Sequence, residues 1–313
     1  MNKHSSIKSA GSLLERASEM YDFGAALRGT SAPAVPVVEP DAMPSPVVAE
    51  PVMAAPAAHV PMAARPTSSN FATINRERLA ANNFIVPDGP VTGLSEEFRI
   101  VKRQLLLAAR GGKGVDAIEH GERILICSAH PNEGKTFCAI NLALSMASEK
   151  DNRVLLVDAD FAKPSVLSTL GIENSPGFMD ALADPTSDAE KFIIETDVEG
   201  LSILPAGAQT NQDTEYLAAS RTATIIDQLT RNDPSRIIIF DSPPALAASP
   251  ASVLALHVGQ TVMVVHADET TDSALRDALS LLSGCEHVQL LLNRAKFSPT
   301  GRKFGNYYGY GAS

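Results

Sequence analysis

Residues 129–136 have the types and spacing of a loop that holds phosphate groups. They read AHPNEGKT, which matches a Walker A loop in which alanine replaces the usual first glycine. Gly134 would let the backbone wrap closely around phosphates, Lys135 would reach the β- and γ-phosphates of ATP, and the Thr136 hydroxyl would ligate Mg²⁺. The segment stands between an apolar stretch typical of a strand and one typical of a helix, whose first N–H groups attract anions. The predicted ATP contacts are Ala129, Pro131, Asn132, Glu133, Gly134, Lys135, Thr136 and Phe137.

Three carboxylates end other apolar stretches further along the chain. Asp158 and Asp160 are two positions apart at one such end, and Asp241, followed by Ser-Pro-Pro, closes another. Carboxylates there can organise Mg²⁺ directly or through water, and one could accept a proton from an attacking hydroxyl group. The predicted catalytic residues are Lys135, Asp158, Asp160 and Asp241, and the predicted magnesium ligands are Thr136 and the three aspartates. For Asp158 or Asp160 alone, a turn or capping role is the alternative.

Six short apolar stretches predict the strands that would position these residues. They are continuous rather than alternating, as expected for a parallel sheet with helices on both faces. In such sheets, ligands bind beyond the carboxyl ends of the strands. The predicted strands are 123–127, 153–158, 201–204, 236–241, 260–266 and 288–293. We therefore expect an α/β fold of the P-loop NTPase class, with a mostly parallel central sheet flanked by helices on both faces.

Asn293 ends the last of these predicted strands. Its side-chain amide could pair with the polar edge of adenine, which makes it a predicted ATP contact. An ordinary turn asparagine at a strand end is the alternative.

The segments before the predicted sheet differ sharply in composition. Residues 12–28 place apolar side chains at helical spacing, which predicts an amphipathic docking helix; a frayed terminal helix is the alternative. Nine prolines between Ser31 and Pro66 predict an extended linker. Helical periodicity resumes at Leu94. The expected domains are a docking helix over 1–30, a disordered Pro/Ala-rich linker over 31–90, the P-loop domain over 91–293 and a flexible basic tail over 294–313.

Composition and charge argue against several classes of protein. The formal charge of −10 opposes general binding to nucleic acid, which depends on Lys and Arg neutralising phosphates. No apolar run is long enough to span a bilayer, and the N-terminus lacks the order of a signal peptide, so we expect a cytoplasmic protein. Cys127, Cys138 and Cys285 lie in apolar stretches without metal-like spacing and are predicted to be buried thiols.

The end of the chain concentrates phenol groups. Three of the five tyrosines, Tyr307, Tyr308 and Tyr310, fall within the last seven residues, among glycines that deny the segment a stable helix or strand. Four basic residues between positions 294 and 303 precede them, and no acidic residue follows Glu286. Such a basic arm could enter an acidic nucleotide site on a neighbouring molecule. An aromatic packing anchor or a disordered tail is the alternative.

Taken together, these motifs resemble those of the bacterial tyrosine kinases of polysaccharide export, in particular the free-standing cytoplasmic autokinases of exopolysaccharide loci. The resemblance covers residues 90–310 and depends on the combination of motifs. Members carry proline and glutamate before Gly-Lys, matched by Pro131 and Glu133, an Asp-x-Asp pair, and an aspartate followed by Ser or Thr and two prolines. The chain differs from many members at Ala162, where they carry arginine.

The resemblance implies a protein-tyrosine autokinase that uses Mg-ATP to phosphorylate tail tyrosines in trans and so regulates exopolysaccharide polymerisation or export. In the family, a helix with Glu-Tyr-Arg packs subunits into a ring, which implies a homo-oligomer with Glu97 and Arg99 at the interface. The implied phosphoacceptors are Tyr307, Tyr308 and Tyr310. The implied partner is a membrane polysaccharide co-polymerase that activates the kinase and holds it at the inner membrane.

Two other functions remain open from the sequence. A positioning ATPase of the MinD/ParA class has a lysine directly after the first loop residue, where this chain has His130. A non-catalytic, ATP-dependent scaffold of the exporter would need Lys135 but not the tail tyrosines. Replacement of all three tyrosines therefore distinguishes a scaffold from an autokinase.

Overall fold

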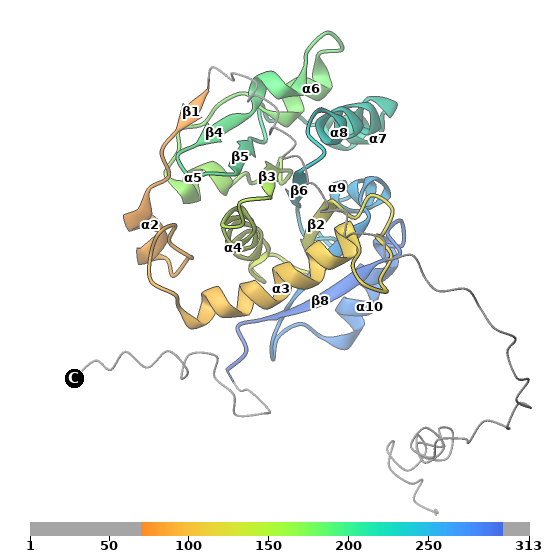
Figure 1. The fold of residues 1–313 in the computed structure, drawn as a ribbon. Helices are drawn as coiled ribbons and strands as arrows, with labels where there is room; N and C mark the ends of the chain where they lie inside the picture. Colours follow the sequence, from red (N-terminus) through yellow and green to blue (C-terminus); the bar gives the residue numbers. More distant parts are fainter. Residues whose placement is uncertain (1–69, 297–313) are drawn as a thin grey trace, which may run out of the picture. The chain divides into compact units, whose positions relative to one another are not determined.

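An eight-stranded sheet runs through the part of the chain that the computed structural model describes, residues 70–296 (Figure 1). Its order is β1-β4-β5-β3-β6-β2-β7-β8, and all neighbours are parallel except β4 and β5. The strands are β1 (Phe71–Ala72), β2 (Arg123–Ser128), β3 (Arg153–Asp158), β4 (Ile194–Thr196), β5 (Leu201–Leu204), β6 (Arg236–Asp241), β7 (Gln260–His266) and β8 (Val288–Asn293). The expected α/β fold with a mostly parallel sheet is confirmed.

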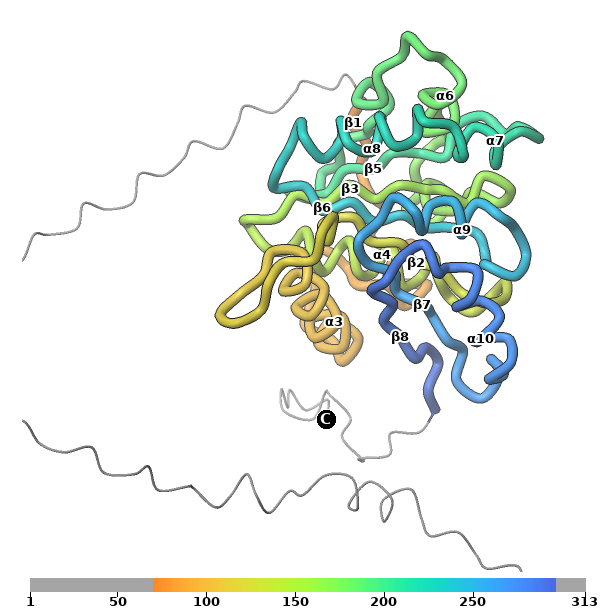
Figure 2. The backbone as a smooth tube through the Cα atoms, turned by 90° about the vertical axis from the view of Figure 1, so that its right-hand side faces the viewer, coloured from red at the N-terminus to blue at the C-terminus, as the bar shows by residue number. Residues whose placement is uncertain are grey.

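Helices cover both faces of this sheet. The α-helices are α2 (Arg76–Ala81), α3 (Gly93–Arg110), α4 (Lys135–Ala147), α5 (Val166–Leu170), α6 (Phe178–Ala183), α7 (Asp213–Ala218), α8 (Ser220–Asn232), α9 (Pro250–Leu254) and α10 (Asp272–Leu281), with short 3₁₀ turns η1 (Ala189–Phe192) and η2 (Ala255–His257). Alternate strand residues face opposite cores: Ile124 packs with α3 and α4, whereas Leu125 packs with α8, α9 and α10. Figures 1 and 2 show these two helix layers. Burial on both faces explains why the inner strands are continuously apolar, whereas Leu290 and Leu292 of the edge strand β8 are exposed.

The six predicted strands are confirmed, and the structure adds β1 and β4 on one side of the sheet. Each of these two has only two or three residues, so neither produces a readable apolar run.

The prediction of a linker over residues 31–90 is wrong for residues 70–90. These residues form β1 and α2 and place Ile74 and Leu79 in the core. Asn75 caps α2 by accepting a hydrogen bond from the Arg78 N–H at 2.9 Å. The composition change that marks the linker ends at Pro66, well before the predicted boundary at residue 90. The predicted docking helix lies outside the described residues.

Helix α3 begins at Gly93, one residue before the predicted start at Leu94. Thr92 caps it by accepting from the Ser95 N–H at 3.2 Å, and Phe98 and Leu105 are buried. The helix packs on α4, the helix that follows the phosphate loop. No helix within residues 70–296 combines the length and apolar character that crossing a bilayer requires.

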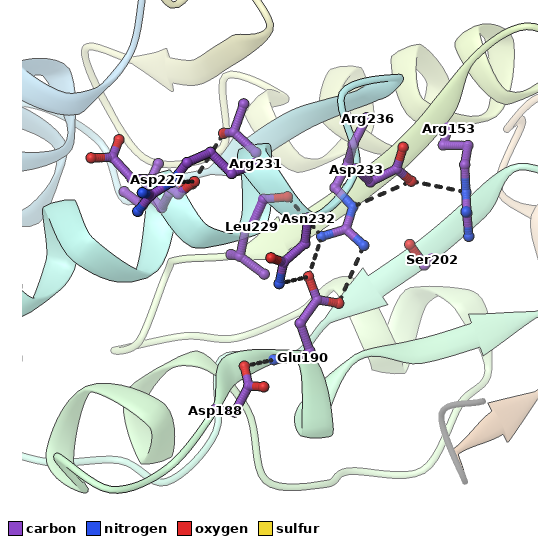
Figure 3. A network of polar contacts seen from close by, with 12 residues as sticks. Arg153, Asp188, Glu190, Ser202, Asp227, Leu229, Arg231, Asn232, Asp233 and Arg236 are labelled. Carbon is purple, nitrogen blue, oxygen red and sulfur yellow. Dashed lines mark hydrogen bonds and ion pairs between the residues drawn. The ribbon is translucent and has the colours of Figure 1, made fainter. Parts of the chain in front are cut away.

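A network of arginines fixes the amino ends of β3 and β6 (Figure 3). Arg236, the first residue of β6, donates to Glu190 Oε1 of η1 at 2.6 Å, and its side chain is 5% exposed. Arg153, which starts β3, pairs with Asp233 at 3.1 Å. Each buried or half-buried charge has an opposite partner here, as low-dielectric surroundings require. The network thus lies at the opposite ends of these strands from their carboxyl ends, where the predicted site residues are found.

Candidate nucleotide-binding site

The phosphate loop connects the carboxyl end of β2 to the start of α4. Strands β3, β6 and β2 are neighbours in the sheet, and Asp158 and Asp241 are register partners at the ends of β3 and β6. Adjacent parallel strands end at one edge, so the loop and the predicted carboxylates meet there. The structure therefore brings Lys135, Thr136, Asp158, Asp160 and Asp241 into one cluster.

Gly134 allows the tight turn at the start of α4. Its φ of 98° is in the left-handed region, and a Cβ atom built there would lie 2.1 Å from Nδ2 of Asn293. Only glycine therefore fits between the loop and the end of β8. The Cys138 N–H donates to the Gly134 carbonyl at 2.9 Å, the first bond of the helix that follows.

Lys135 makes an ion pair with Asp160, with Nζ 2.8 Å from Oδ2. Burial by itself lowers the pKa of Lys135, but the charges of Asp241, Asp160 and Asp158 outweigh it and raise that pKa above its usual value. The lysine is thus a permanent cation among carboxylates, suited to neutralising phosphate groups.

Asp158 is held entirely by backbone N–H groups. Its Oδ2 accepts from Ser165 and Val166, each at 3.0 Å, and its Oδ1 accepts from Asp160 at 3.2 Å. Burial raises the pKa of Asp158 to about 6, although these hydrogen bonds oppose the rise. The carboxylate therefore shapes the loop that carries Asp160 and leads into α5. These contacts are those of a turn or capping aspartate, the alternative given in the sequence analysis for Asp158. Its role as a magnesium ligand stays a prediction.

Asp241 is fully buried, and neither of its carboxylate oxygens accepts a hydrogen bond of good geometry within residues 70–296, although the Thr136 hydroxyl and the Lys135 charge lie close enough to lower its pKa. Burial raises the pKa of Asp241 to about 7, against the opposing charge of Lys135. A buried carboxylate without partners is costly unless a cation compensates it. This orphaned group, beside Thr136, fits the predicted magnesium.

No set of three or more His, Cys, Asp or Glu side chains among the described residues could hold a metal ion. Magnesium in nucleotide sites needs fewer protein ligands, because it keeps waters and binds substrate phosphates with one or two carboxylates. Thr136 and Asp241 are the residues that fit that pattern, with Ser165 Oγ 3.4 Å from Thr136 Oγ1.

The remaining loop residues divide by exposure. Pro131 and Asn132 are exposed, Ala129 and Glu133 are buried, and Asn132 has a φ of 66°. Glu133 accepts through Oε2 from the His130 N–H at 2.8 Å and through Oε1 from the Thr270 hydroxyl. Its carboxylate is therefore occupied by protein groups.

Phe137 and Asn293 lie beside the loop. Phe137 packs against Phe84, with ring centroids 4.9 Å apart and ring planes tilted by 46°, and thus faces the packed side of α4. Asn293 Nδ2 donates to the Glu133 carbonyl at 2.8 Å. Its predicted contact with adenine stays untested.

Glu97 and Arg99 lie on α3, and Glu97 lines a pocket with Phe137 and Asn293. Glu97 is exposed, and Arg99 pairs with Glu96 within the helix. Their predicted role in an oligomer is not tested by one molecule. Tyr307, Tyr308 and Tyr310 lie outside the described residues. All three cysteines are free and buried, as predicted.

Two residues of the site were missed from the sequence. Thr270 reaches Glu133 across 137 positions, and nothing in the local pattern marks it. Ser165, beside Thr136, could have been noticed because it closely follows the Asp-x-Asp pair, where a parallel sheet collects its functional groups.

The parallel sheet, the glycine-bearing phosphate loop and the carboxylates at its strand ends define a P-loop NTPase. The AAA domain family matches residues 122–295. The chain is 28% identical over 238 residues to the tyrosine-protein kinase YwqD of Bacillus subtilis, covering 75% of this chain and 94% of that one. The chain therefore belongs to the AAA domain family and, within it, to the bacterial tyrosine kinases.

Two further similarities bear on this membership. The crystal structure of the chimerical protein CapA2B2 aligns with a TM-score of 0.58 and 25% identity, covering 72% of this chain and 94% of that chain. The tyrosine-protein kinase wzc of Salmonella typhimurium is 28% identical over 190 residues, or 60% of this chain. The chain spans only 26% of the length of that relative.

Proposed function

We propose that the protein is a protein-tyrosine autokinase that transfers the γ-phosphate of ATP to tyrosines in the C-terminal tail of a neighbouring copy. The observation that carries the proposal is the cluster of Lys135, Asp160 and the orphaned Asp241 at the phosphate loop. Relatives named tyrosine-protein kinases support the choice of acceptor.

The residues of the cluster have separate tasks in this proposal. Lys135 and the N–H groups at the start of α4 bind the phosphates and neutralise their charge. Thr136 and Asp241 would hold Mg²⁺, which when bound supplies charge neutralisation between the phosphates. Asp158 keeps the loop of Asp160 in place through three backbone hydrogen bonds.

Asp160 is the proposed proton acceptor. Phosphates arriving at the loop draw Lys135 away and release the Asp160 carboxylate for the phenol. The phenolic oxygen forms a bond to the γ-phosphorus, the bond from that phosphorus to the β,γ-bridging oxygen breaks, ADP leaves, and the phenolic proton goes to Asp160. A phenol ionises near pH 10, so a nearby base is useful at neutral pH.

The acceptors in this proposal are Tyr307, Tyr308 and Tyr310, on a basic tail that suits an acidic site. Phosphates added to the tail repel that site and loosen the assembly, giving a cycle of association and release. The assembly is a homo-oligomer with Glu97 and Arg99 at its interface. A membrane polysaccharide co-polymerase activates it at the inner membrane, and the cycle regulates exopolysaccharide polymerisation or export.

Mass spectrometry after incubation with Mg-ATP tests the proposal, with and without membranes of the producing cell. Wild type is expected to carry phosphate on the tail tyrosines, and Lys135→Ala is expected to carry none. Lys150→Ala, at an exposed site away from the loop, is the matched control and should behave as wild type.

Replacement of all three tail tyrosines by phenylalanine separates an autokinase from a scaffold. An autokinase should lose polysaccharide export control in this variant while still binding ATP. Unphosphorylated tails in wild type under both conditions, with ATP bound, would instead favour the scaffold. Phosphotyrosine that persists in Lys135→Ala would contradict the assigned site.

A further inference from the structure

A hydrogen-bonded chain joins the phosphate loop to the loop that follows β7. Thr270 lies at the centre of this chain. Its hydroxyl donates to Oε1 of Glu133, and the hydroxyl oxygen of Thr270 accepts from the His266 N–H at 2.9 Å. The other oxygen of Glu133, Oε2, accepts from the His130 N–H at 2.8 Å. One buried carboxylate therefore ties together two loops that are far apart in the sequence.

Glu133 lies between two residues of the phosphate loop that have left-handed backbone conformations. Asn132 before it and Gly134 after it both have left-handed φ values, 66° and 98°. A non-glycine residue in that region costs energy and persists when its surroundings hold it there. The Glu133 carboxylate and its carbonyl, which accepts from Asn293 at 2.8 Å, supply such support from outside the turn.

We infer that Glu133 and Thr270 are positioning residues for the nucleotide: together they hold the phosphate loop in its binding shape before the nucleotide arrives. Both carboxylate oxygens of Glu133 are engaged by protein donors, so its effect on phosphates passes through the backbone. A loop already in its bound shape loses less conformational freedom on binding, which strengthens affinity. The inference rests on the proposed function only in assigning a nucleoside phosphate to this loop.

Binding of Mg-ADP to the full chain, measured by titration calorimetry, tests this role without requiring any phosphoryl transfer. Thr270→Val removes the hydroxyl at nearly constant shape and is expected to weaken ADP binding about tenfold, the effect of losing one hydrogen bond to a charged group. Thr270→Ser restores the hydroxyl and should bind within about twofold of wild type. Thr224→Val, at an exposed position on α8, is the matched control and should bind as wild type.

Glu133→Gln gives a second route to the same conclusion. The amide cannot accept at both positions, so ADP binding is again expected to weaken about tenfold. The double variant Glu133→Gln/Thr270→Val should be little weaker than either single variant, because both changes break one linkage.

Two outcomes would overturn the inference. If Thr270→Val and Glu133→Gln bind ADP as tightly as wild type, the linkage does not position the loop, even where both variants unfold at lower urea concentration. If Thr270→Ser binds as weakly as Thr270→Val, the hydroxyl is not the cause. Failure of wild type to bind ADP would overturn both this inference and the proposed autokinase function. ADP binding without any phosphotyrosine would contradict the autokinase function and leave the positioning role unaffected.

Discussion

Lys135 and Asp160 pair directly across the phosphate-binding site, with Nζ 2.8 Å from Oδ2. The lysine belongs to the start of α4 and the aspartate to the loop after β3. The Asp160 carboxylate would therefore compete with the phosphates of a bound nucleotide for this lysine. Nucleotide binding must therefore replace the Asp160 carboxylate by a phosphate beside Lys135. Nucleotide binding and phosphoryl transfer should for this reason respond differently to mutation of Asp160.

Asp160→Asn should affect binding and transfer in opposite directions. Removal of a negative charge beside Lys135 is expected to strengthen ADP binding in magnesium-free buffer, because the phosphates meet less repulsion. Loss of the proposed proton acceptor should slow tail phosphorylation about 100-fold. Calorimetry and timed mass spectrometry measure the two effects. An unchanged rate of phosphorylation would remove Asp160 as the proton acceptor.

Stability without nucleotide should fall as the pH rises from about 4 to about 7. Burial raises the pKa of Asp241 to about 7 and that of Asp158 to about 6. In this range the folded protein binds more protons than the unfolded chain, whose aspartates have already ionised, so the free energy of unfolding decreases with pH. Urea unfolding between about pH 4.5 and about pH 7.5 measures this, and Asp241→Asn should show a flatter dependence. An equally steep dependence in that variant would mean that Asp241 ionises normally.

Gly134→Ala should abolish measurable nucleotide binding. The new Cβ would meet Asn293 Nδ2 at 2.1 Å, and the φ of 98° is unfavourable for alanine. Adding Asn293→Ala should restore part of the binding, because it removes the clash but not the backbone cost. Gly114→Ala is the control, since Gly114 also has a left-handed φ but no atom within 4 Å of a built Cβ. Calorimetry with ADP decides between these outcomes, and full binding by Gly134→Ala would contradict the described turn.

Arg236→Ala should destabilise the fold without touching the site. Arg236 is buried and pairs with Glu190, and its removal leaves an uncompensated acid, for which a cost of about 3–5 kcal/mol is typical. Arg231→Ala, on the exposed side of α8, should change the free energy of unfolding by less than about 0.5 kcal/mol. Urea unfolding at one pH compares the two. A similar small effect for both would show that solvent screens the network.

The sequence predicted most of the sheet because its inner strands are buried on both faces. All four positions from 237 to 240 are apolar, and a central parallel strand explains such an uninterrupted run simply. Strands β1 and β4 lack this signal because they are short and near an edge. The predicted linker reaches residue 90, too far along the chain, because Ile74 and Leu79 are isolated apolar residues whose partners lie elsewhere in the chain.

The site was predictable as a set of positions, but not as a set of contacts. Strand ends placed Asp158 and Asp241 together, yet the sequence could not distinguish an aspartate held by three N–H groups from one left without partners. That difference depends on how residues 160–166 turn. The bond from Thr270 to Glu133 was equally unreadable, because it depends on where two distant loops meet.

The two ends of the sheet differ in how completely their buried charged side chains are paired. At the amino ends, Arg236 and Arg153 are both paired with acids; at the carboxyl ends, Lys135 pairs with Asp160, while the oxygens of Asp241 accept no hydrogen bond of good geometry within residues 70–296. Folding stability and chemistry therefore depend on residues at opposite ends of the same strands. Natural variation in this protein should accordingly be tolerated unequally along each strand, with the arginine end constrained by folding and the aspartate end by chemistry.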